Sequence, residues 1–438
     1  MKLGIVYHMP FWRGSDGSLF ELEGSFARYV DSLAPFFDQL SICAPSIQPP
    51  PGGGTRVRSR NVELAALAPF DGPRQFYPRL ISHSTAIARW VASLDVLHCR
   101  VPTPAALPAF IAARRRGIPI FLLVVGDLVA VLPTLPYRGI KRVVFSRYTA
   151  LEEWALAWMA GRALTFANGA ALAAKHRRAG ADVVETRTTT IAASDIGSRS
   201  DTCLGPVVRV LTVSRIDPRK GLRCLPAVIA ELVRQGMDAT IDIIGPPVGS
   251  PGLAERTAIE RDAQALDVAG RVRLAGPVPL DRLLPRYRDY DVFVLPTSPG
   301  EGIPRVLLEA MAAGLPVVVT RIAGIPGLVT HGRNGYLIDT ATADAVAGAV
   351  MTVSRDGALR RRLIQGGYQT ARRHTLDGQA AQMMAVAAER FGLSLRRACE
   401  RPPRSGSSRA PSRNEGAERG AGVPASEEAG VQGRARSG

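Results

Sequence analysis

The feature that most constrains this chain is an alternation of short apolar runs with longer stretches of helical periodicity. Each apolar run ends in glycine, proline or polar residues, as a buried strand does. Strands that are apolar on both faces belong to parallel sheets, because crossover helices then cover both sides of the sheet. The strands predicted in this way are 3–7, 40–44, 96–98, 120–125, 164–166, 207–213, 240–244, 272–274, 292–295 and 316–320.

These strands form two successive sets, one in each half of the chain. Two such sets predict an α/β chain with two Rossmann-like, doubly wound parallel-sheet domains. We place the first domain at 1–200 and the second at 201–375, joined by the polar stretch 194–205, with a helix at 376–396. Residues 397–438 are rich in Arg, Pro, Ser, Gly and Glu, and we expect them to be a disordered basic tail.

Composition narrows the class of protein but does not choose its ligand. Hydrophobic residues make up 46% of the 438 residues, which excludes a chain that is disordered throughout or a small disulfide scaffold. The net charge is +17, of which residues 1–200 carry +9, so the first half should attract an anion. The net charge alone does not distinguish between nucleic acid, anionic lipid and phosphorylated substrates as the anionic partner.

The cysteines and the longest apolar stretch indicate the compartment. The five cysteines are scattered and form no C-x-x-C pair, which favours reduced thiols of a cytosolic protein over disulfides or a zinc site. The longest apolar stretch, 118–135, is interrupted by Gly126, Asp127 and Pro133, and a bilayer-spanning helix needs about 20 predominantly apolar residues. We therefore expect no transmembrane helix and a cytoplasmic protein.

The most informative segment of the sequence is 298–316, which follows the predicted strand 292–295. Pro304 suits the first position of a helix and Gly314 suits the residue just beyond its end. The loop before this helix would present free backbone N–H groups and a positive helix end at the carboxyl edge of a sheet. Open α/β sheets bind ligands at that edge, so the segment predicts an anion-binding loop.

Two carboxylates belong to the same segment. Glu301 lies in the loop and Glu309 lies about two turns into the helix, so both can face one side. Carboxylates repel phosphate but accept hydrogen bonds from sugar hydroxyls. The alternative, a capped core helix with two exposed acids, is the commoner explanation for this spacing when it occurs alone.

A second loop favours the ligand-binding interpretation of these carboxylates over the capped core helix. The predicted strand 207–213 runs into a loop with Arg215 and Lys220, which would lie at the same edge of the same sheet. Two fixed cations can neutralise a diphosphate and its departing charge without a metal ion. A solvated basic loop is the alternative. Together the two loops predict a site for a nucleotide whose diphosphate leaves and whose sugar is bound by carboxylates.

These residues resemble the hallmarks of retaining glycosyltransferases of the GT-B fold, family four, also called glycosyl transferases group 1. The resemblance is carried by Glu301-Gly-Ile-Pro and Glu309-Ala-Met-Ala-Ala-Gly-Leu-Pro, and by Ser214-Arg215 with Lys220-Gly221. Gly276, the run from Asp291 to Pro296 and the run from Gly332 to Leu337 also match. The match is specific from about 207 to 338 and diffuse elsewhere.

The resemblance implies two domains that face a central cleft, with the helix at 376–396 crossing back to the first domain. It assigns the diphosphate to Arg215 and Lys220, the ribose hydroxyls to Glu309, and the donor sugar to Glu301. The backbone of the loop would surround the sugar and phosphate, and residues 276–278 would flank the base. The implied catalytic residues are Glu301, Arg215 and Lys220, and the implied substrate-binding residues are Gly302, Ile303, Pro304, Glu309, Gly276 and Val278.

Two further acidic features are weaker. Asp127 follows the strand 120–125, where related enzymes often carry a His that faces the donor sugar; it could bind a sugar hydroxyl or the acceptor, or simply cap the next segment. Asp289-Tyr290-Asp291 has the form of a D-x-D metal–diphosphate motif. It falls at the opposite edge of the sheet, and we interpret it as structural. We therefore predict no metal ion and no cofactor.

The segment 137–148 interleaves basic and apolar residues, with Arg114, Arg115 and Arg116 near it in sequence. An amphipathic basic segment can lie on anionic lipid, which would suit a lipid-linked acceptor; a solvated helix face is the alternative. A peripheral position at the inner face of the membrane would follow.

The sequence as a whole predicts an enzyme of class EC 2.4. It would move a sugar from a nucleoside-diphosphate sugar to an acceptor hydroxyl with retention, in the synthesis of a polysaccharide, glycolipid or cell-envelope glycan. Its partners would be the nucleotide sugar, a glycan or lipid-linked acceptor and an anionic membrane surface, with no nucleic acid. Two rival functions are a sugar-nucleotide epimerase of the same architecture and a basic nucleic-acid-binding protein.

Overall fold

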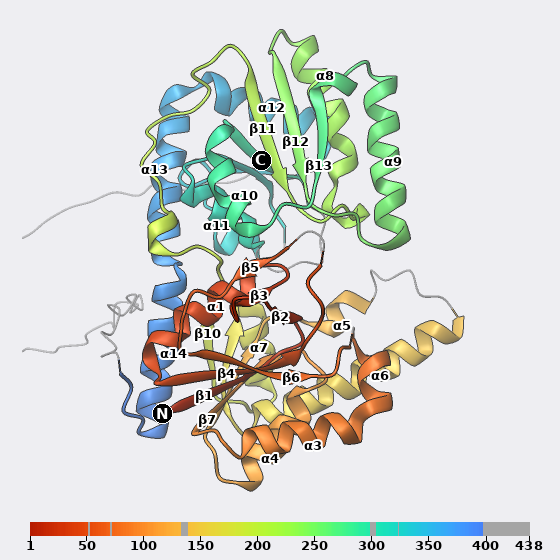
Figure 1. The fold of residues 1–438 in the computed structure, drawn as a ribbon. Coiled ribbons are helices and arrows are strands. Elements are labelled where there is room, and N and C mark those ends of the chain that lie inside the picture. Colours follow the sequence, from red (N-terminus) through yellow and green to blue (C-terminus); the bar gives the residue numbers. More distant parts are fainter. Residues whose placement is uncertain (51–52, 71, 133–138, 298–303, 323, 397–438) are drawn as a thin grey trace, which may run out of the picture. The chain divides into compact units, whose positions relative to one another are not determined.

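The computed structural model describes residues 1–396 except 51–52, 71, 133–138, 298–303 and 323. Two parallel sheets dominate it, one in each half of the chain (Figure 1). The first sheet has seven strands, in the spatial order β10 (Val183–Thr186), β9 (Leu164–Asn168), β8 (Ile120–Val124), β7 (Val96–Val101), β1 (Lys2–Val6), β4 (Gln39–Pro45) and β6 (Val62–Leu67).

The second sheet has six strands, and all of its pairings are parallel. Their spatial order is β13 (Val272–Gly276), β12 (Ala239–Ile244), β11 (Val208–Val213), β14 (Val292–Leu295), β15 (Val317–Thr320) and β16 (Tyr336–Ile338). The two-domain, doubly wound α/β prediction is therefore confirmed. A small antiparallel sheet of β2 (Phe11–Arg13), β3 (Leu19–Glu21) and β5 (Thr55–Arg56) was not expected from the sequence.

Helices supply the crossovers between the parallel strands. Those in the first half are α1 (Ser25–Leu33), α2 (Pro73–Phe76), α3 (Leu80–Val91), α4 (Ala106–Arg115), α5 (Leu128–Val131), α6 (Gly139–Ala160) and α7 (Ala170–Arg178). The crossover helices in the second half are α8 (Leu225–Arg234), α9 (Gly249–Ala265), α10 (Leu280–Arg286) and α11 (Arg305–Ala312). Three more helices follow the last strand: α12 (Ala343–Arg355), α13 (Gly357–Arg373) and α14 (Leu376–Phe391).

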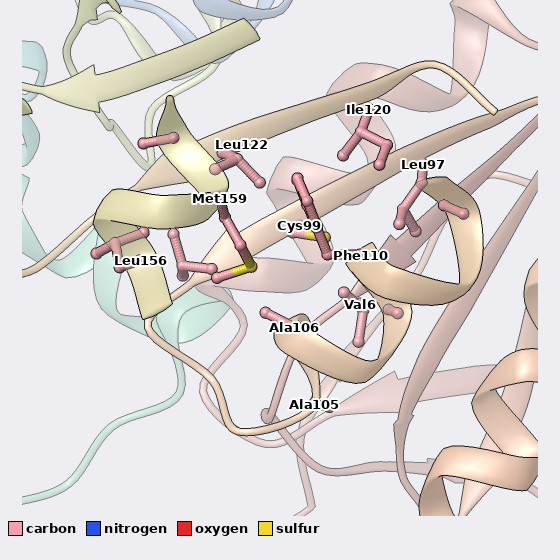
Figure 2. Packing of buried hydrophobic residues seen from close by; sticks show 14 of the residues in the cluster. Val6, Leu97, Cys99, Ala105, Ala106, Phe110, Ile120, Leu122, Leu156 and Met159 are labelled. Carbon is pink, nitrogen blue, oxygen red and sulfur yellow. The ribbon is translucent and has the colours of Figure 1, made fainter. Parts of the chain in front are cut away.

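Both faces of the first sheet are covered, as its apolar strands require. On β7, Leu97, Cys99 and Val101 belong to a core that also contains Phe110 of α4 and Met159 of α6 (Figure 2). Val96 on the same strand faces the opposite core, which includes residues of α1 and α14. Because successive side chains of a strand point to opposite faces, a strand buried on both sides reads as a continuous apolar run.

The last helix, α14, packs on the first sheet although it follows the second sheet in the sequence. Met383 and Met384 are fully buried in the core that contains Leu3 and Ile5 of β1. The helix contacts α1 and β9, and it lies beside α1 in Figure 1. Thr375 caps its start by accepting a hydrogen bond from the Gly378 N–H, and Gly392 ends it in a left-handed conformation.

Candidate active site at the carboxyl edge of the second sheet

The loop that follows β11 carries the two predicted cations, Arg215 and Lys220. Arg215 is exposed, whereas Lys220 is buried in a short 3-10 turn that spans Pro218–Lys220. Asp217 caps this turn and forms an ion pair with Arg219, and the hydrogen bond from Arg219 lowers the pKa of the Asp217 carboxyl. The loop therefore has a fixed backbone with one cation pointing out and one held inside.

Gly221 brings this loop against the end of β14. Its φ is +65°, and a Cβ placed on it would lie 2.0 Å from the carbonyl oxygen of Pro296. No other residue fits there, because a side chain would clash with backbone that cannot move aside cheaply. The hydroxyl of Thr297 donates to the carbonyl of Arg219 over 3.3 Å, and Thr320 donates to the carbonyl of Thr297 over 2.7 Å. The ends of β11, β14 and β15 are thus tied together.

The loop between β14 and α11 contains the predicted residues Glu301, Gly302 and Ile303, which lie outside the described residues. Pro304 is half-buried and is the N-cap of α11, with helical geometry beginning at Arg305. The helix therefore starts one residue later than predicted, because the ψ of Pro304 is 126°, an extended value. Gly314 follows the helix end with φ +74°, as predicted.

Glu309 lies on α11 and is only 4% exposed. Both of its carboxylate oxygens accept hydrogen bonds from hydroxyl groups: Thr190 donates to Oε1 over 2.5 Å and Tyr287 donates to Oε2 over 2.7 Å. Burial and the neighbouring carboxylate raise the pKa of Tyr287, so this hydroxyl remains a donor. Sequence reasoning missed both partners, since nothing in their local sequence indicates which carboxylate they reach.

Gly276 and Val278 complete the predicted residues of this sheet. Gly276 ends β13 with φ +71°, and its carbonyl accepts the Gly245 N–H over 2.9 Å at the end of β12. Val278 is half-buried and packs on the core beneath this edge. The structure thus brings Arg215, Lys220, Pro304, Gly276 and Val278 to the carboxyl edge of one sheet, where open α/β sheets bind ligands.

Asp127 belongs to the other sheet and has partners of its own. One oxygen accepts the Val129 N–H over 3.0 Å, so Asp127 caps the start of α5, one of the roles that the sequence left open. The other oxygen pairs with Lys175 of α7 over 2.9 Å, and Lys175 also binds Glu153 over 2.9 Å. Asp127 therefore lies at the carboxyl edge of the first sheet within a network of charged groups.

The D-x-D sequence lies at the amino edge of the second sheet, just before β14. Asp291 is buried, and its two oxygens accept the backbone N–H groups of Cys203 and Arg209, each over 2.9 Å. These bonds tie the start of the domain to its central strands. Among the described residues, no three His, Cys, Asp or Glu side chains gather in a way that could hold a metal ion.

Comparison with known proteins points to the same half of the chain. Residues 207–356 match the family profile described as Glycosyl transferases group 1. D-inositol 3-phosphate glycosyltransferase of Corynebacterium urealyticum is 33% identical over 176 residues, which are 40% of this chain and 41% of that protein. The putative colanic acid biosynthesis glycosyltransferase WcaL of Salmonella typhimurium is 35% identical over 162 residues, 36% and 38% of the two chains. The chain thus spans about two fifths of the length of these curated relatives.

Solved structures extend the likeness of the fold to both sheets. Sucrose-phosphate synthase from Thermosynechococcus elongatus superposes with a TM-score of 0.69 at 17% identity, covering 90% of this chain and all of that one. Anabaena HepE, solved in complex with UDP, gives a TM-score of 0.64 at 17% identity, covering 89% of this chain and all of its own. At these identities the likeness shows the fold alone.

No helix among the described residues has both the length and the apolar character that crossing a membrane demands. Taken with the geometry of the second sheet, the comparisons show a similarity and not a membership. Residues 207–356 are similar to the Glycosyl transferases group 1 family, and the chain shares the two-sheet fold of the solved sucrose-phosphate synthase.

Proposed function

We propose that this protein transfers a sugar from a nucleoside-diphosphate sugar to an acceptor hydroxyl with retention of configuration. The observation that supports it most is the packing of the Arg215–Lys220 loop against the end of β14 through Gly221. That contact holds the loop with Arg215 and Lys220 at the carboxyl edge of the second sheet, within residues 207–356, which match the group 1 glycosyltransferases. The binding of UDP by HepE makes a uridine nucleotide the first donor to test.

The proposed reaction is a front-face displacement without a metal ion. The bond between the anomeric carbon and the diphosphate oxygen breaks, while the acceptor oxygen bonds to that carbon. The acceptor proton passes to the departing diphosphate, whose charge Arg215, Lys220 and the amino end of α11 stabilise. Glu301 would hold the donor sugar and support its developing positive charge, and Glu309 would bind the ribose hydroxyls.

The test combines donor binding with turnover. We expect UDP to raise the Tm of the wild-type protein, because a ligand that binds only the folded state stabilises it. Glu301→Gln and Lys220→Met should fold normally and lower the transfer rate by about 100-fold or more. Arg223→Met is the matched control, since Arg223 is exposed and pairs with Asp262 over 3.1 Å. Turnover at the wild-type rate in both site variants would overturn the assignment.

The same assay separates the rival functions. Consumption of the donor without an acceptor would favour an epimerase, and a salt-dependent gel shift with RNA or DNA but no response to nucleotide sugars would favour nucleic-acid binding. EDTA should leave the transfer rate unchanged. Loss of activity that a divalent cation restores would instead contradict the metal-free mechanism.

We also propose that the first domain contacts an anionic membrane surface through α6. Its exposed stripe contains Ile140, Val144, Arg147, Leu151 and Trp154, which recur at helical spacing; Ile140 is 80% and Trp154 63% exposed. Lys141 and Arg142 flank the stripe and are exposed as well. Apolar residues beside fixed positive charge suit a layer of acidic headgroups above acyl chains.

Co-sedimentation with vesicles tests this surface. Vesicles with 30% phosphatidylglycerol should bind the protein more strongly than pure phosphatidylcholine vesicles, and binding should weaken as salt is raised. Trp154→Glu should reduce binding, whereas Leu253→Glu, on the exposed face of α9, should not. Equal binding of both variants, or self-association through the stripe in place of lipid binding, would refute the proposal.

A further inference from the structure

Arg100, the fifth residue of β7, is buried, and none of the described residues gives it a negatively charged partner. It is 6% exposed, and its Nε is enclosed with no hydrogen-bond partner. Within the described part of the chain, no carboxylate forms an ion pair with its guanidinium. A buried charge is stable only when it is paired, so an unpaired arginine here needs an explanation.

Aromatic rings surround this guanidinium. Its central carbon lies 4.7 Å from the ring centroid of Tyr29, 5.0 Å from that of Tyr7 and 5.4 Å from that of Phe26. Cation–π attraction offsets part of the cost of burial. It does not use the N–H donors, which lie in the plane of the guanidinium and need acceptors.

The neighbouring polar group carries no compensating charge. His98 is fully buried; its Nε2 lies 2.9 Å from the Tyr29 hydroxyl and its Nδ1 lies 3.4 Å from the Phe121 carbonyl. Burial lowers the pKa of His98 to about 3, so the ring is neutral at pH 7. A histidine ring is neutral or positive and cannot balance an arginine, so the described surroundings of Arg100 are neutral and aromatic and leave its positive charge available to a ligand.

Arg100 also lies where ligands bind in this kind of sheet. It pairs in register with Leu123, the fourth of the five residues of β8, at the carboxyl edge of the first sheet. Tyr7 follows β1 at that same edge. Three residues beyond Arg100, Thr103 is buried, and its hydroxyl has no hydrogen-bond partner in the described part of the chain. One edge thus holds a cation and a hydroxyl that no described residue pairs.

We propose that Arg100 binds an oxyanion, a phosphate or a carboxylate, carried by the acceptor. A guanidinium presents parallel N–H donors that match both groups bidentately. Assigning the anion to the acceptor rests on the proposed function, in which Arg215 and Lys220 on the second sheet bind the diphosphate of the donor. A neutral sugar could not compensate the buried charge.

Thermal unfolding with simple anions tests the site without turnover. The wild-type protein is titrated with inorganic phosphate, and separately with acetate, with chloride at equal ionic strength as the reference. We expect a saturating rise in Tm with phosphate or with acetate, and the anion that acts tells which group the acceptor carries. Arg89→Met, on the exposed surface of α3, is the matched control and should respond as the wild type does.

Arg100→Met should abolish the saturating response while keeping the Tm in chloride equal to or above that of the wild type, because it removes an unpaired buried charge. A solely structural arginine predicts the reverse: a lower Tm and an unchanged anion response. If Arg100→Met fails to fold, Arg100→Lys is the second variant, because lysine keeps a positive charge but lacks the planar guanidinium. The apparent affinity of Arg100→Lys for the anion should fall about 10-fold or more.

The outcomes also separate this inference from the proposed function. UDP should stabilise the wild type and Arg100→Met equally, since the donor site lies on the other sheet. No response of the wild type to either anion, or equal responses in the wild type and the Arg100 variants, would overturn the oxyanion site. Failure of UDP to stabilise any variant would contradict the donor site and leave the anion result standing.

Discussion

At the residue scale, Glu309 shows that a buried carboxylate can accept hydrogen bonds from the protein and still have acceptor sites left for a ligand. Its two oxygens accept hydroxyl groups from Thr190 and Tyr287. An ionised carboxylate has about four lone-pair sites, so two remain for the ribose hydroxyls that we propose it binds. The hydroxyl donors fix the rotamer of Glu309 and keep its charge hydrogen-bonded in a position with little solvent.

Tyr287→Phe should therefore destabilise the protein by about 1.5–3 kcal/mol, the range for a hydrogen bond to a charged group. The reason is that Tyr287 is fully buried and Glu309 would lose one of its donors inside the core. Urea unfolding at pH 7 measures the change. Tyr336→Phe, at a half-buried ring that contacts His331, should change the stability by less than about 0.5 kcal/mol. Equal effects of the two variants would contradict the prediction.

His98 gives a pH dependence at the same scale. Burial holds its pKa at about 3, below the ordinary value of 6.5, so below pH 6.5 the unfolded chain binds a proton that the folded chain does not. Stability should therefore fall as the pH drops from about 6.5 towards 3, by about 1.4 kcal/mol per pH unit from this group. His98→Gln should reduce the slope of unfolding free energy against pH by that amount between pH 4 and 6. Parallel curves would show that His98 does not contribute.

At the scale of elements, α14 stabilises a sheet to which it is not adjacent in sequence. Its buried face, with Met383 and Met384, fills the core beside α1 and β1. The apolar spacing of residues 379–391 predicts a helix but does not identify its packing partner; only the family resemblance suggested the first domain. The helix contributes mainly through burial, because isolated helices of this length are marginal in water.

Met384→Ala should cost about 2–5 kcal/mol of unfolding free energy, since it removes a fully buried side chain and leaves a cavity. Arg390→Ala, on the exposed side of the same helix, should cost less than about 1 kcal/mol, because its ion pair with Asp182 is exposed to solvent. Chemical unfolding of both variants checks the pair. A small effect of Met384→Ala would mean that α14 can detach without loss of the core.

At the scale of the whole molecule, different groups of positively charged residues have different proposed roles. We assign Arg215 and Lys220 to the donor and Arg100 to the acceptor, and α6 adds exposed basic residues beside an apolar stripe. The predicted disordered tail, 397–438, carries a net charge of +3 and lies outside the described residues. Immediately before it, Arg396 pairs with Asp38 over 3.2 Å, and Leu393 and Leu395 pack on the core of the first sheet.

Truncation after Arg396 should leave the Tm within about 2 °C of the full chain, because a segment of this composition cannot bury enough apolar surface to stabilise the fold. Truncation after Phe391 removes Leu393, Leu395 and Arg396 as well, and should lower the Tm clearly. Differential scanning fluorimetry of the two truncated chains makes the comparison. A large drop for the first truncation would assign the tail a structural role.

The strands of the two parallel sheets that the sequence failed to predict share a physical property. β6, β10 and β16 are edge strands of their sheets, and β6 is half-buried along most of its length. An edge strand is covered on fewer sides, so its residues need not form a continuous apolar run. The strands in the middle of both sheets were all predicted, because burial on both faces leaves a clear signal.

The sequence by itself determined the α/β class, the central strands of both sheets and the loops that end them, since these follow from local apolar runs and from turn residues. It also placed Arg215, Lys220 and Glu309 on those loops and helices. Only the tertiary structure decided which side chains meet: Thr190 reaches Glu309 across 119 residues of sequence, and Arg100 is enclosed by the ring of Tyr7, just after β1, and by two rings of α1. The physical reason is that hydrogen bonds and unpaired charges depend on packing between distant segments, which no local pattern records.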